Sequence, residues 1–145
     1  MKAIVQRVHS SSVEIDGIVH ASIRRGMTVL IGYCKGDDST KNVWLSEKLL
    51  GLRIFPDELG KMNRSILDIS GSILLIPNFT LCADTNRGLR PSFVQAEDPV
   101  FAKELFANLL SVMNEIYPKI ASGVFGADMN VSIENDGPVT LIFER

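Results

Sequence analysis

The spacing of hydrophobic residues switches repeatedly between a two-residue period and a helical period, and this order limits the folds open to the chain. Residues 1–8 (MKAIVQRV) and 129–133 alternate apolar and polar side chains, which predicts strands with one buried face. Residues 27–33 form a continuous apolar run typical of a central strand. Two segments, 39–52 and 99–116, carry apolar residues at helical spacing. The order strands, helix, strands, helix, strands predicts an α+β or mixed α/β fold with two main helices.

Short polar turns between apolar stretches predict that much of the sheet is antiparallel. Asp16-Gly17 separates two such stretches and predicts a tight hairpin. Ser70-Gly71 lies between residues 66–69 and 72–76 and predicts a second hairpin. The second helix has a clear start signal in Asp98-Pro99, an N-cap residue followed by a proline at the first helical position.

The sequence Asn135-Asp136-Gly137-Pro138 near the end of the chain is less ordinary. Asp-Gly is typical of a two-residue hairpin turn, but Pro138 removes a backbone donor where a second strand would begin to pair. Proline is also the residue before which a cis peptide bond costs least, and such a bond would present its flanking carbonyls in a fixed orientation. From spacing alone, a plain turn is the simpler interpretation.

Length and composition indicate one soluble domain. The 145 residues are expected to form a single domain, 1–145, and the 46% of hydrophobic residues suffice for a core. No apolar run approaches the roughly 20 residues of a membrane span, and the first residues lack the continuous apolar stretch of a signal peptide. We therefore expect a cytoplasmic protein. A formal net charge of −2 argues against broad nonspecific nucleic-acid binding and permits a local basic patch.

Cysteine and histidine are too sparse to predict a metal centre. The chain has two cysteines, Cys34 and Cys82, outside any CxxC motif, which argues against both a disulfide scaffold and a thiolate metal site. The two histidines, His9 and His20, add no recognisable ligand spacing. Cys82 with a histidine base would make a nucleophile, but a small buried thiol is the simpler interpretation. We expect neither metal nor cofactor.

Three polar or glycine-containing segments are candidates for ligand binding. Thr80 follows an apolar strand, where a threonine serves either as a β-former or as a ligand-facing hydroxyl. Arg87 and Arg90 lie in a polar loop that is either merely solvated or suited to phosphate groups. Phe125 lies between two glycines, which fits either a tight turn or a backbone that approaches a ligand while the ring stacks on a base. Residue patterns alone predict no catalytic triad and name no substrate.

Four stretches taken together resemble one family, the D-aminoacyl-tRNA deacylases. They are MKAIVQRV (1–8), LRIFPDELGKMNRSILDISGSILLIPNFTL (52–81), ADTNRGLRPSF (83–93) and GVFGADMNVSIENDGPVT (123–140). They occur in the family's order and run nearly end to end. The most specific parts are the FTL stretch after a strand, the FGADM segment and the NxGPxT ending.

The resemblance implies a homodimer with a compact, barrel-like fold whose active sites lie at the interface. Members hydrolyse the ester that joins a D-amino acid to the terminal adenosine of tRNA, and they also remove glycine from mischarged tRNA. In the family a Gly-Pro motif with a cis peptide reaches into the partner's site and rejects L-amino acids, and the ribose 2′-hydroxyl assists the attack. The implied chiral gate is Gly137-Pro138, braced by Arg7.

The remaining site residues carry over by position. The catalytic pocket matches Asn78, Phe79 and Thr80, and the adenosine-side wall matches Phe125, Gly126, Ala127 and Met129. Arg87 and Arg90 are the candidates for contact with tRNA phosphates.

Two adjacent positions depart from the family pattern, and they leave alternatives open. The family usually has Ser-Gln before Phe-Thr-Leu, whereas this chain has Pro77-Asn78, which lacks the serine hydroxyl and one backbone N–H. A related branch that edits L-alanine attached to tRNA also carries proline there, although Phe79 and the NDGPVT ending favour the D-specific branch. The alternatives are therefore an L-alanyl-tRNA editor and a tRNA- or nucleotide-binding module without catalysis. A cysteine hydrolase that uses Cys82 is a more distant one.

Overall fold

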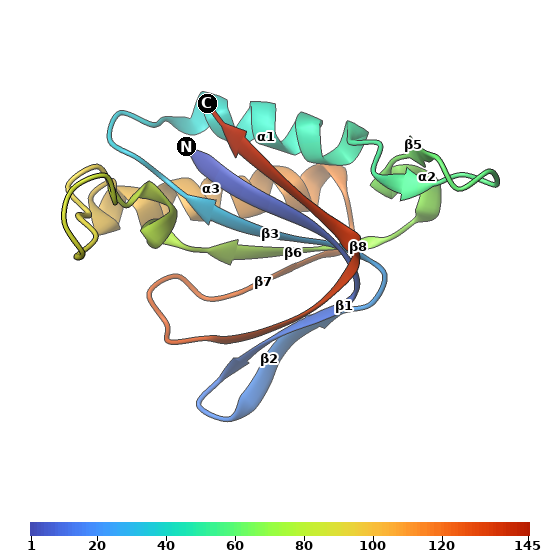
Figure 1. The fold of residues 1–145 in the computed structure, drawn as a ribbon, viewed down its shortest axis with the longest axis horizontal. Helices are drawn as coiled ribbons and strands as arrows, with labels where there is room; N and C mark the ends of the chain where they lie inside the picture. The colour runs from blue at the N-terminus through green and yellow to red at the C-terminus, as the bar shows by residue number, and fades with distance from the viewer.

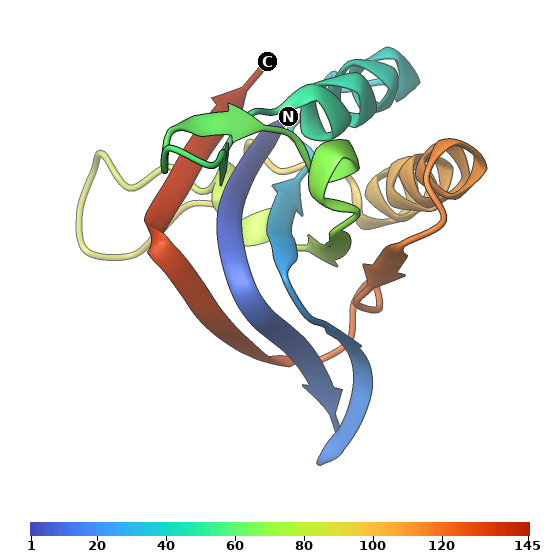
Figure 2. The ribbon, with the colours of Figure 1, turned by 90° about the vertical axis from the view of Figure 1, so that its right-hand side faces the viewer.

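A strongly curved six-stranded sheet and two long helices make up most of the chain in this computed structural model, which describes residues 1–145 (Figure 1). The helices α1 and α3 lie on one side of the sheet, and the far ends of the strands curl round into a nearly closed barrel (Figures 1 and 2). The fold is mixed α+β, as the sequence predicts. The elements are β1 (Lys2–Ile15), β2 (Ile18–Ile23), β3 (Gly26–Gly32), α1 (Ser39–Gly51), β4 (Phe55–Pro56), β5 (Met62–Arg64), α2 (Ile66–Ile69), β6 (Ser72–Pro77), the 3₁₀ turn η1 (Phe79–Cys82), α3 (Pro99–Ile116), β7 (Ile120–Ser122) and β8 (Asn130–Glu144).

The long strand β1 organises the sheet. One edge of β1 pairs with β3 near its start and with β2 near its end, while the other edge pairs with β8 along its length, and all three pairings are antiparallel. On the far side, β3, β6 and β7 are parallel neighbours. The strand β2 approaches β6 and β7, which narrows the opening of the barrel. Only one edge of β8 is paired, so the other edge of this 15-residue strand is free.

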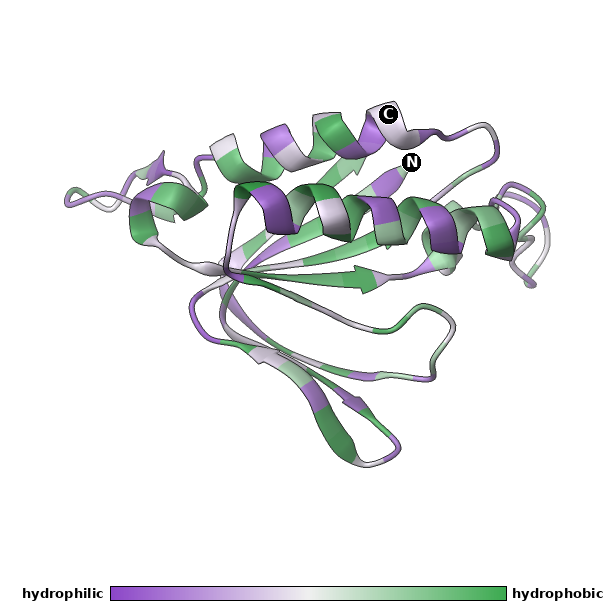
Figure 3. Cartoon of the chain, turned by 180° about the vertical axis from the view of Figure 1, so that it is seen from behind, coloured by the Kyte–Doolittle hydropathy of each residue, from purple (hydrophilic) through white to green (hydrophobic).

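The main core lies between the two long helices and the sheet. Fully buried Leu45 and Leu49 of α1 and Leu109 of α3 pack with Val29 and Leu75 of the central strands. Figure 3 shows α1 and α3 side by side, with hydrophilic stretches along their outer sides. Neither helix is long and apolar enough to cross a bilayer.

Both long helices begin at a capping aspartate, and the one at the start of α3 is the predicted Asp98. Asp38 accepts a hydrogen bond from the backbone N–H of Thr40 at 2.9 Å. Asp98 accepts one from Val100 N–H at 2.9 Å, with Pro99 as the first helical residue. Each carboxylate satisfies a backbone donor that has no partner within its helix, which fixes the point where the helix starts.

The expected hairpin at Ser70-Gly71 is wrong. Residues Ile66–Ile69 form the short helix α2, because Ser65 and Asp68 make a reciprocal capping box at its start. Ser70 ends that helix in the left-handed conformation, with φ of +49°. The following strand β6 then pairs in parallel with β3. Four apolar residues in a row are too few to distinguish a helix from a strand by period. The hairpin at Asp16-Gly17, in contrast, is confirmed.

A plain turn at Gly137-Pro138 is also wrong, because β8 continues through this segment. Gln6 pairs with Thr140 and Val8 pairs with Asn135, so the four residues 136–139 lie opposite Arg7 alone. The strand bends sharply at these residues, which we call the β8 bend (Figures 1 and 2). The Gly137–Pro138 peptide bond is cis, which confirms that part of the expectation. Both residues are exposed.

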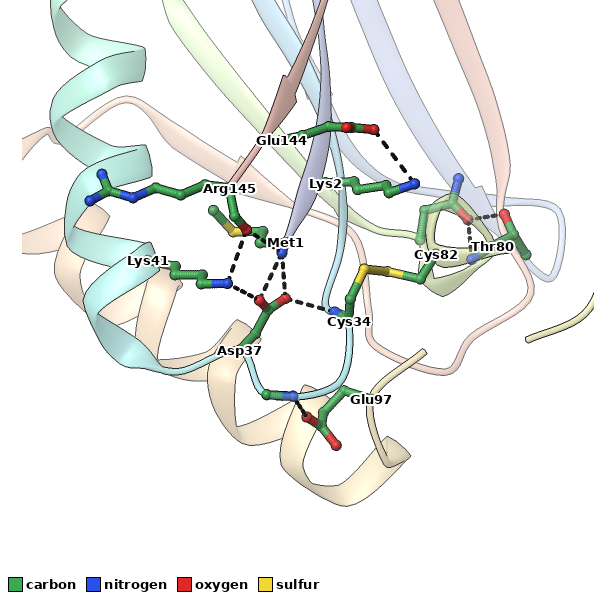
Figure 4. Close-up of a disulfide and its surroundings, with 12 residues drawn as sticks. Met1, Lys2, Cys34, Asp37, Lys41, Thr80, Cys82, Glu97, Glu144 and Arg145 are labelled. Carbon is green, nitrogen blue, oxygen red and sulfur yellow. Dashed lines mark hydrogen bonds and ion pairs between the residues drawn. A yellow bond between two sulfur atoms is a disulfide. The ribbon is translucent and has the colours of Figure 1, made fainter. Parts of the chain in front are cut away.

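Cys34 and Cys82 form a disulfide bond, which contradicts the expectation of unpaired cysteines (Figure 4). The two residues are 48 positions apart, and their Cα atoms are 5.7 Å apart. They meet because η1 folds back onto the end of β3, where Asn78 N–H donates to Ile31 O at 2.7 Å. A rule based on short cysteine spacing cannot detect a pair that the fold brings together. Cys82 is therefore not a free buried thiol, and the cysteine-hydrolase alternative loses its nucleophile in this state.

Candidate active site

Two adjoining cavities meet at Phe79 and Gly126, and we call them together the Phe79 groove. The smaller cavity has a volume of about 330 Å³ and lies between the end of β6, η1 and the segment before β8. Its lining includes five of the predicted site residues: Asn78, Phe79, Gly126, Ala127 and Met129. The larger cavity has a volume of about 610 Å³, and Phe125 joins its lining. The fold thus brings together residues that lie nearly 50 positions apart in the sequence.

The turn η1 holds Thr80 in one orientation. Asn78 caps the turn, and its Oδ1 accepts hydrogen bonds from Thr80 Oγ1 at 2.6 Å and from Thr80 N–H at 3.3 Å. The Thr80 hydroxyl is exposed and donates its proton to Asn78, so its oxygen is left as an acceptor. No histidine or carboxylate accepts this proton. A threonine without an adjacent base is a weak nucleophile, so the geometry favours a binding and positioning role.

Aromatic rings dominate the larger cavity. Phe79 packs edge-on against Phe93, with ring centroids 5.2 Å apart, although 54% of Phe79 remains exposed. Phe125 and Lys35 also line this cavity. A planar group that packs on the exposed face of a phenylalanine in a groove is stabilised, because both apolar surfaces leave water. The cavity therefore suits a planar aromatic ligand, and its charged lining residues are Lys35, Glu97 and Asp98.

The wall opposite η1 depends on two glycines. Gly126 has φ of +79°, a conformation that residues with a side chain rarely adopt. A Cβ at Gly123 would lie 2.7 Å from Met129 Sδ, so the absence of a side chain lets Met129 close the wall. Met129 in turn packs on the buried cluster inside the barrel. The groove wall is thus formed by backbone that rests on the partly buried thioether of Met129.

The β8 bend is held from one side by a buried arginine. Arg7 is 9% exposed, and its Nη1 donates to Ile54 O at 2.6 Å. Its Nε donates to Asp136 O at 3.1 Å and lies 3.0 Å from Asp136 Oδ2. Bonds to both the backbone and the side chain of Asp136 fix the start of the bend relative to β1.

An asparagine holds the other side of the β8 bend. Asn135 Nδ2 donates to Val139 O at 3.1 Å, and Asn135 Oδ1 accepts from Val139 N–H at 3.0 Å. The Asn135 amide therefore replaces the two backbone hydrogen bonds that Val139 does not make with β1. It also ties together the two ends of the bend. Gly137 and Pro138 project between these two anchors. Neither residue lines the Phe79 groove of the same chain, and the β8 bend lies at the far end of the sheet from η1 (Figure 1).

Arg87 and Arg90 lie in an exposed loop next to the groove. The loop is closed at its base by the backbone bonds between Asp84 and Ser92, at 2.8 Å and 2.9 Å. Neither arginine lines either cavity of the groove. Their contact with phosphate stays a prediction.

The comparison with known proteins decides the family. Residues 4–144 match the family model described as D-Tyr-tRNA(Tyr) deacylase. The chain belongs to this deacylase family. A D-aminoacyl-tRNA deacylase of Clostridium tetani is 50% identical over 144 residues, which cover 99% of this chain and 97% of the relative. One from Pseudomonas aeruginosa is 46% identical and covers 99% of both chains.

Two solved structures share the fold of this chain over nearly its whole length. A c-Myc DNA unwinding element binding protein superposes with a TM-score of 0.95 at 37% identity, covering 100% of this chain and 99% of that one. A probable eukaryotic D-amino acid tRNA deacylase superposes with a TM-score of 0.86 at 14% identity, which shows the shared fold. The family model and the relatives about 50% identical over the full chain show that the chain is an enzyme of the deacylase type.

Sequence reasoning missed three features of this deacylase. Asn135 belongs to the NxGPxT motif, but its spacing of four from Val139 does not reveal that its side chain bonds that residue. Phe93 lay in the loop with the two arginines, but its contact with Phe79 depends on the tertiary fold. The disulfide was excluded for want of a local motif. No group of three or more potential metal ligands occurs in the chain.

Proposed function

We propose that this deacylase hydrolyses the ester between a D-amino acid and the terminal adenosine of tRNA, releasing free tRNA and the D-amino acid. Mischarged glycyl-tRNA is a second substrate. The observation that carries the proposal is the Phe79 groove, which is lined by six of the seven residues that match the family pocket, all but Thr80, while the Thr80 hydroxyl beside it bonds an amide and no acid or base. An aminoacyl ester is already activated, so an enzyme that acts on it gains most from positioning.

The residues of the groove divide between the two ends of the ester. The aminoacyl group lies against Phe79 and Thr80, and the terminal adenosine lies along the wall of residues 125–129. The Thr80 oxygen, whose proton is committed to Asn78, accepts a hydrogen bond from the substrate. Phe125 offers a ring face to the base. The roles of Asn78 and Thr80 are thus to orient the ester.

The tRNA itself supplies the assisting group. The 2′-hydroxyl next to the ester assists the attack, and the protein contributes orientation and backbone donors for the negative charge that develops on the carbonyl oxygen. The absence of a base beside Thr80 supports this division of labour. The protein's main contribution to specificity is then to exclude substrates that carry an L side chain.

The β8 bend is the proposed source of that exclusion, acting across a homodimer. Gly137 and Pro138 are exposed, pinned by Arg7 and Asn135, and remote from their own groove. The neighbouring edge of β8 is free, and Ile142 on it is 70% exposed, as expected of a surface that a second copy covers. In the dimer each bend enters the partner's groove, where its backbone clashes with an L side chain. Glycine has no side chain to reject and is hydrolysed.

Pro77 keeps an L-alanyl-tRNA editor as the second candidate. It ends β6 opposite Ile31 and lines the smaller cavity without a hydroxyl. Hydrolysis of L-alanyl-tRNA in preference to D-esters would establish this alternative. Binding of tRNA without any turnover would establish a non-catalytic module.

A mixed-dimer experiment tests the cross-subunit arrangement. Arg7→Met loosens the bend and leaves the groove intact, whereas Phe79→Ala damages the groove and leaves the bend intact. We expect the Arg7→Met homodimer to hydrolyse L-tyrosyl-tRNA. Adding excess Phe79→Ala chain should then suppress that activity while D-tyrosyl-tRNA hydrolysis persists, because each intact groove now receives an intact bend. Suppression of neither activity, with exchange of subunits verified by mass, would overturn the cross-subunit gate.

A further inference from the structure

The disulfide between Cys34 and Cys82 joins two walls of the Phe79 groove. Cys82 is the last residue of η1, two positions after Thr80, and is 2% exposed. Cys34 follows β3 and precedes Lys35, which lines the larger cavity with Phe79 and Phe93. The backbone around Cys34 also bridges to Ala96, and Lys35 N–H donates to Gln95 O at 2.9 Å. One covalent bond therefore links η1 to the strand-like segments on the opposite rim.

Both cysteines lie on otherwise well-anchored backbone. Cys34 N–H donates to Asp37 Oδ2 at 2.7 Å, and Asp37 also receives hydrogen bonds from Lys41 and the Met1 ammonium (Figure 4). On the other side, Gly32 is packed so closely against η1 that a Cβ there would lie 2.8 Å from Asn78 O. The two sulfur atoms therefore stay close even when the bond is open.

We propose that Cys34 and Cys82 form a reversible redox site that sets the rigidity of the Phe79 groove. The inference rests on the proposed function, since the groove is the site it regulates. The chemical partner is a small-molecule thiol and its disulfide, of the glutathione class. With the bond closed, η1 is held at both ends, by Asn78 at its start and by Cys82 at its finish. With the bond open, the end of η1 is held only by the packing of buried Cys82, and the exposed loop after η1 gains freedom.

The exchange is balanced by two small thiols. A thiolate attacks the sulfur of Cys34, which is the less buried of the pair, and Cys82 leaves as a thiolate that takes up a proton. A second thiolate attacks the small-molecule sulfur of the mixed disulfide, which frees Cys34 and forms the small-molecule disulfide. Two electrons pass from the small thiols to the protein, and the reverse reaction closes the bond.

When the bond is open, the groove loses more conformational entropy as it orders around a substrate. Residues that are fixed beforehand lose no further freedom on binding, whereas mobile ones do. We expect reduction to raise the KM for D-tyrosyl-tRNA by about threefold to tenfold with little change in kcat, on the scale of one or two newly mobile side chains. The closed form is therefore the more effective editor at low substrate.

The test compares the full-length protein equilibrated in reduced and in oxidised glutathione. Thiols are counted after denaturation, KM and kcat are measured with D-tyrosyl-tRNA, and hydrogen exchange is followed over residues 79–96. Cys34→Ser and Cys82→Ala serve as paired variants that cannot form the bond. We expect two thiols in the reduced wild type and none in the oxidised form. We also expect KM and exchange to respond to oxidation in the wild type alone.

The possible results distinguish a failure of the redox proposal from a failure of the proposed function. Failure of the bond to form at any glutathione ratio would overturn the redox site, as would equal KM and equal exchange in the two forms. In either case deacylation that persists leaves the proposed function standing. If neither form hydrolyses the ester, the function is refuted, and hydrogen exchange alone then decides the redox site.

Discussion

Replacing Arg7 with methionine tests how the β8 bend is held. Methionine keeps an unbranched apolar stem but removes the guanidinium and its hydrogen bonds to Ile54 O and to the backbone and carboxylate of Asp136. Arg7 is 9% exposed, so the abandoned acceptors are not freely hydrated. Removing one member of a buried charged pair costs about 3–5 kcal/mol. Because Asp136 is 21% exposed and His9 stays 3.6 Å away, we expect the lower end, about 3 kcal/mol.

Urea unfolding measures this loss, and a matched variant on the same strand controls for it. With a slope of about 2 kcal/mol per M, the Arg7→Met midpoint should fall by about 1.5 M. Lys2→Met removes another β1 cation, but its pair with Glu144 is 3.5 Å long and exposed, so it should cost at most about 1 kcal/mol. In parallel, Arg7→Met should gain L-tyrosyl-tRNA hydrolysis. Equal stability of the two variants together with unchanged L-rejection would refute the bracing role.

Three further changes test the groove and the electrostatics. Thr80→Ala should slow D-tyrosyl-tRNA hydrolysis by about 10-fold, the effect of one lost hydrogen bond, and complete loss with intact tRNA binding would contradict RNA-assisted catalysis. The double change of Arg87 and Arg90 to alanine should weaken tRNA binding and lower its salt slope by about 1.5; an unchanged slope would exclude phosphate contact. Burial opposes the charged form of Asp37, but hydrogen bonds from Lys41, the Met1 ammonium and Cys34 N–H outweigh it and hold the Asp37 pKa below its ordinary 3.8. That stability is present above the ordinary value and is lost as the pH falls through the lowered pKa. Asp37→Asn should therefore unfold more easily at pH 7 and show a shallower loss of stability below about pH 4 in acid titrations followed by circular dichroism, whereas an identical acid profile would exclude this role.

The parts of the fold that sequence predicts correctly are those governed by neighbouring residues. Asp16-Gly17 needs only its own turn conformation to form a hairpin, and Asp38 and Asp98 cap helices through donors two residues away. The short helix α2 also has a local cause, the capping box of Ser65 and Asp68, but its four residues look equally like a strand. Local sequence patterns therefore predict a helix or strand best when the element is long enough to contain several helical turns or several residues of an alternating pattern.

The features that escape prediction depend on register and on chain segments far apart. The β8 bend exists because four residues lie opposite Arg7, and nothing within residues 130–144 reveals that both halves pair with the same strand. The contact of Cys34 with Cys82 likewise requires η1 to fold back onto β3. Among the site residues, those near Phe79 could be grouped from the family pattern, and the structure places them around one groove. Asn135 could not be assigned its role, because its bonds form only once the bend exists.

The most direct test is a side-by-side deacylation assay of the purified protein with D-tyrosyl-, L-tyrosyl- and L-alanyl-tRNA at equal concentrations. We expect rapid loss of the D-ester and stability of both L-esters, which would show that Pro77-Asn78 is tolerated in a D-specific groove. Preferential hydrolysis of L-alanyl-tRNA, or no turnover of any ester despite tRNA binding, would contradict the account.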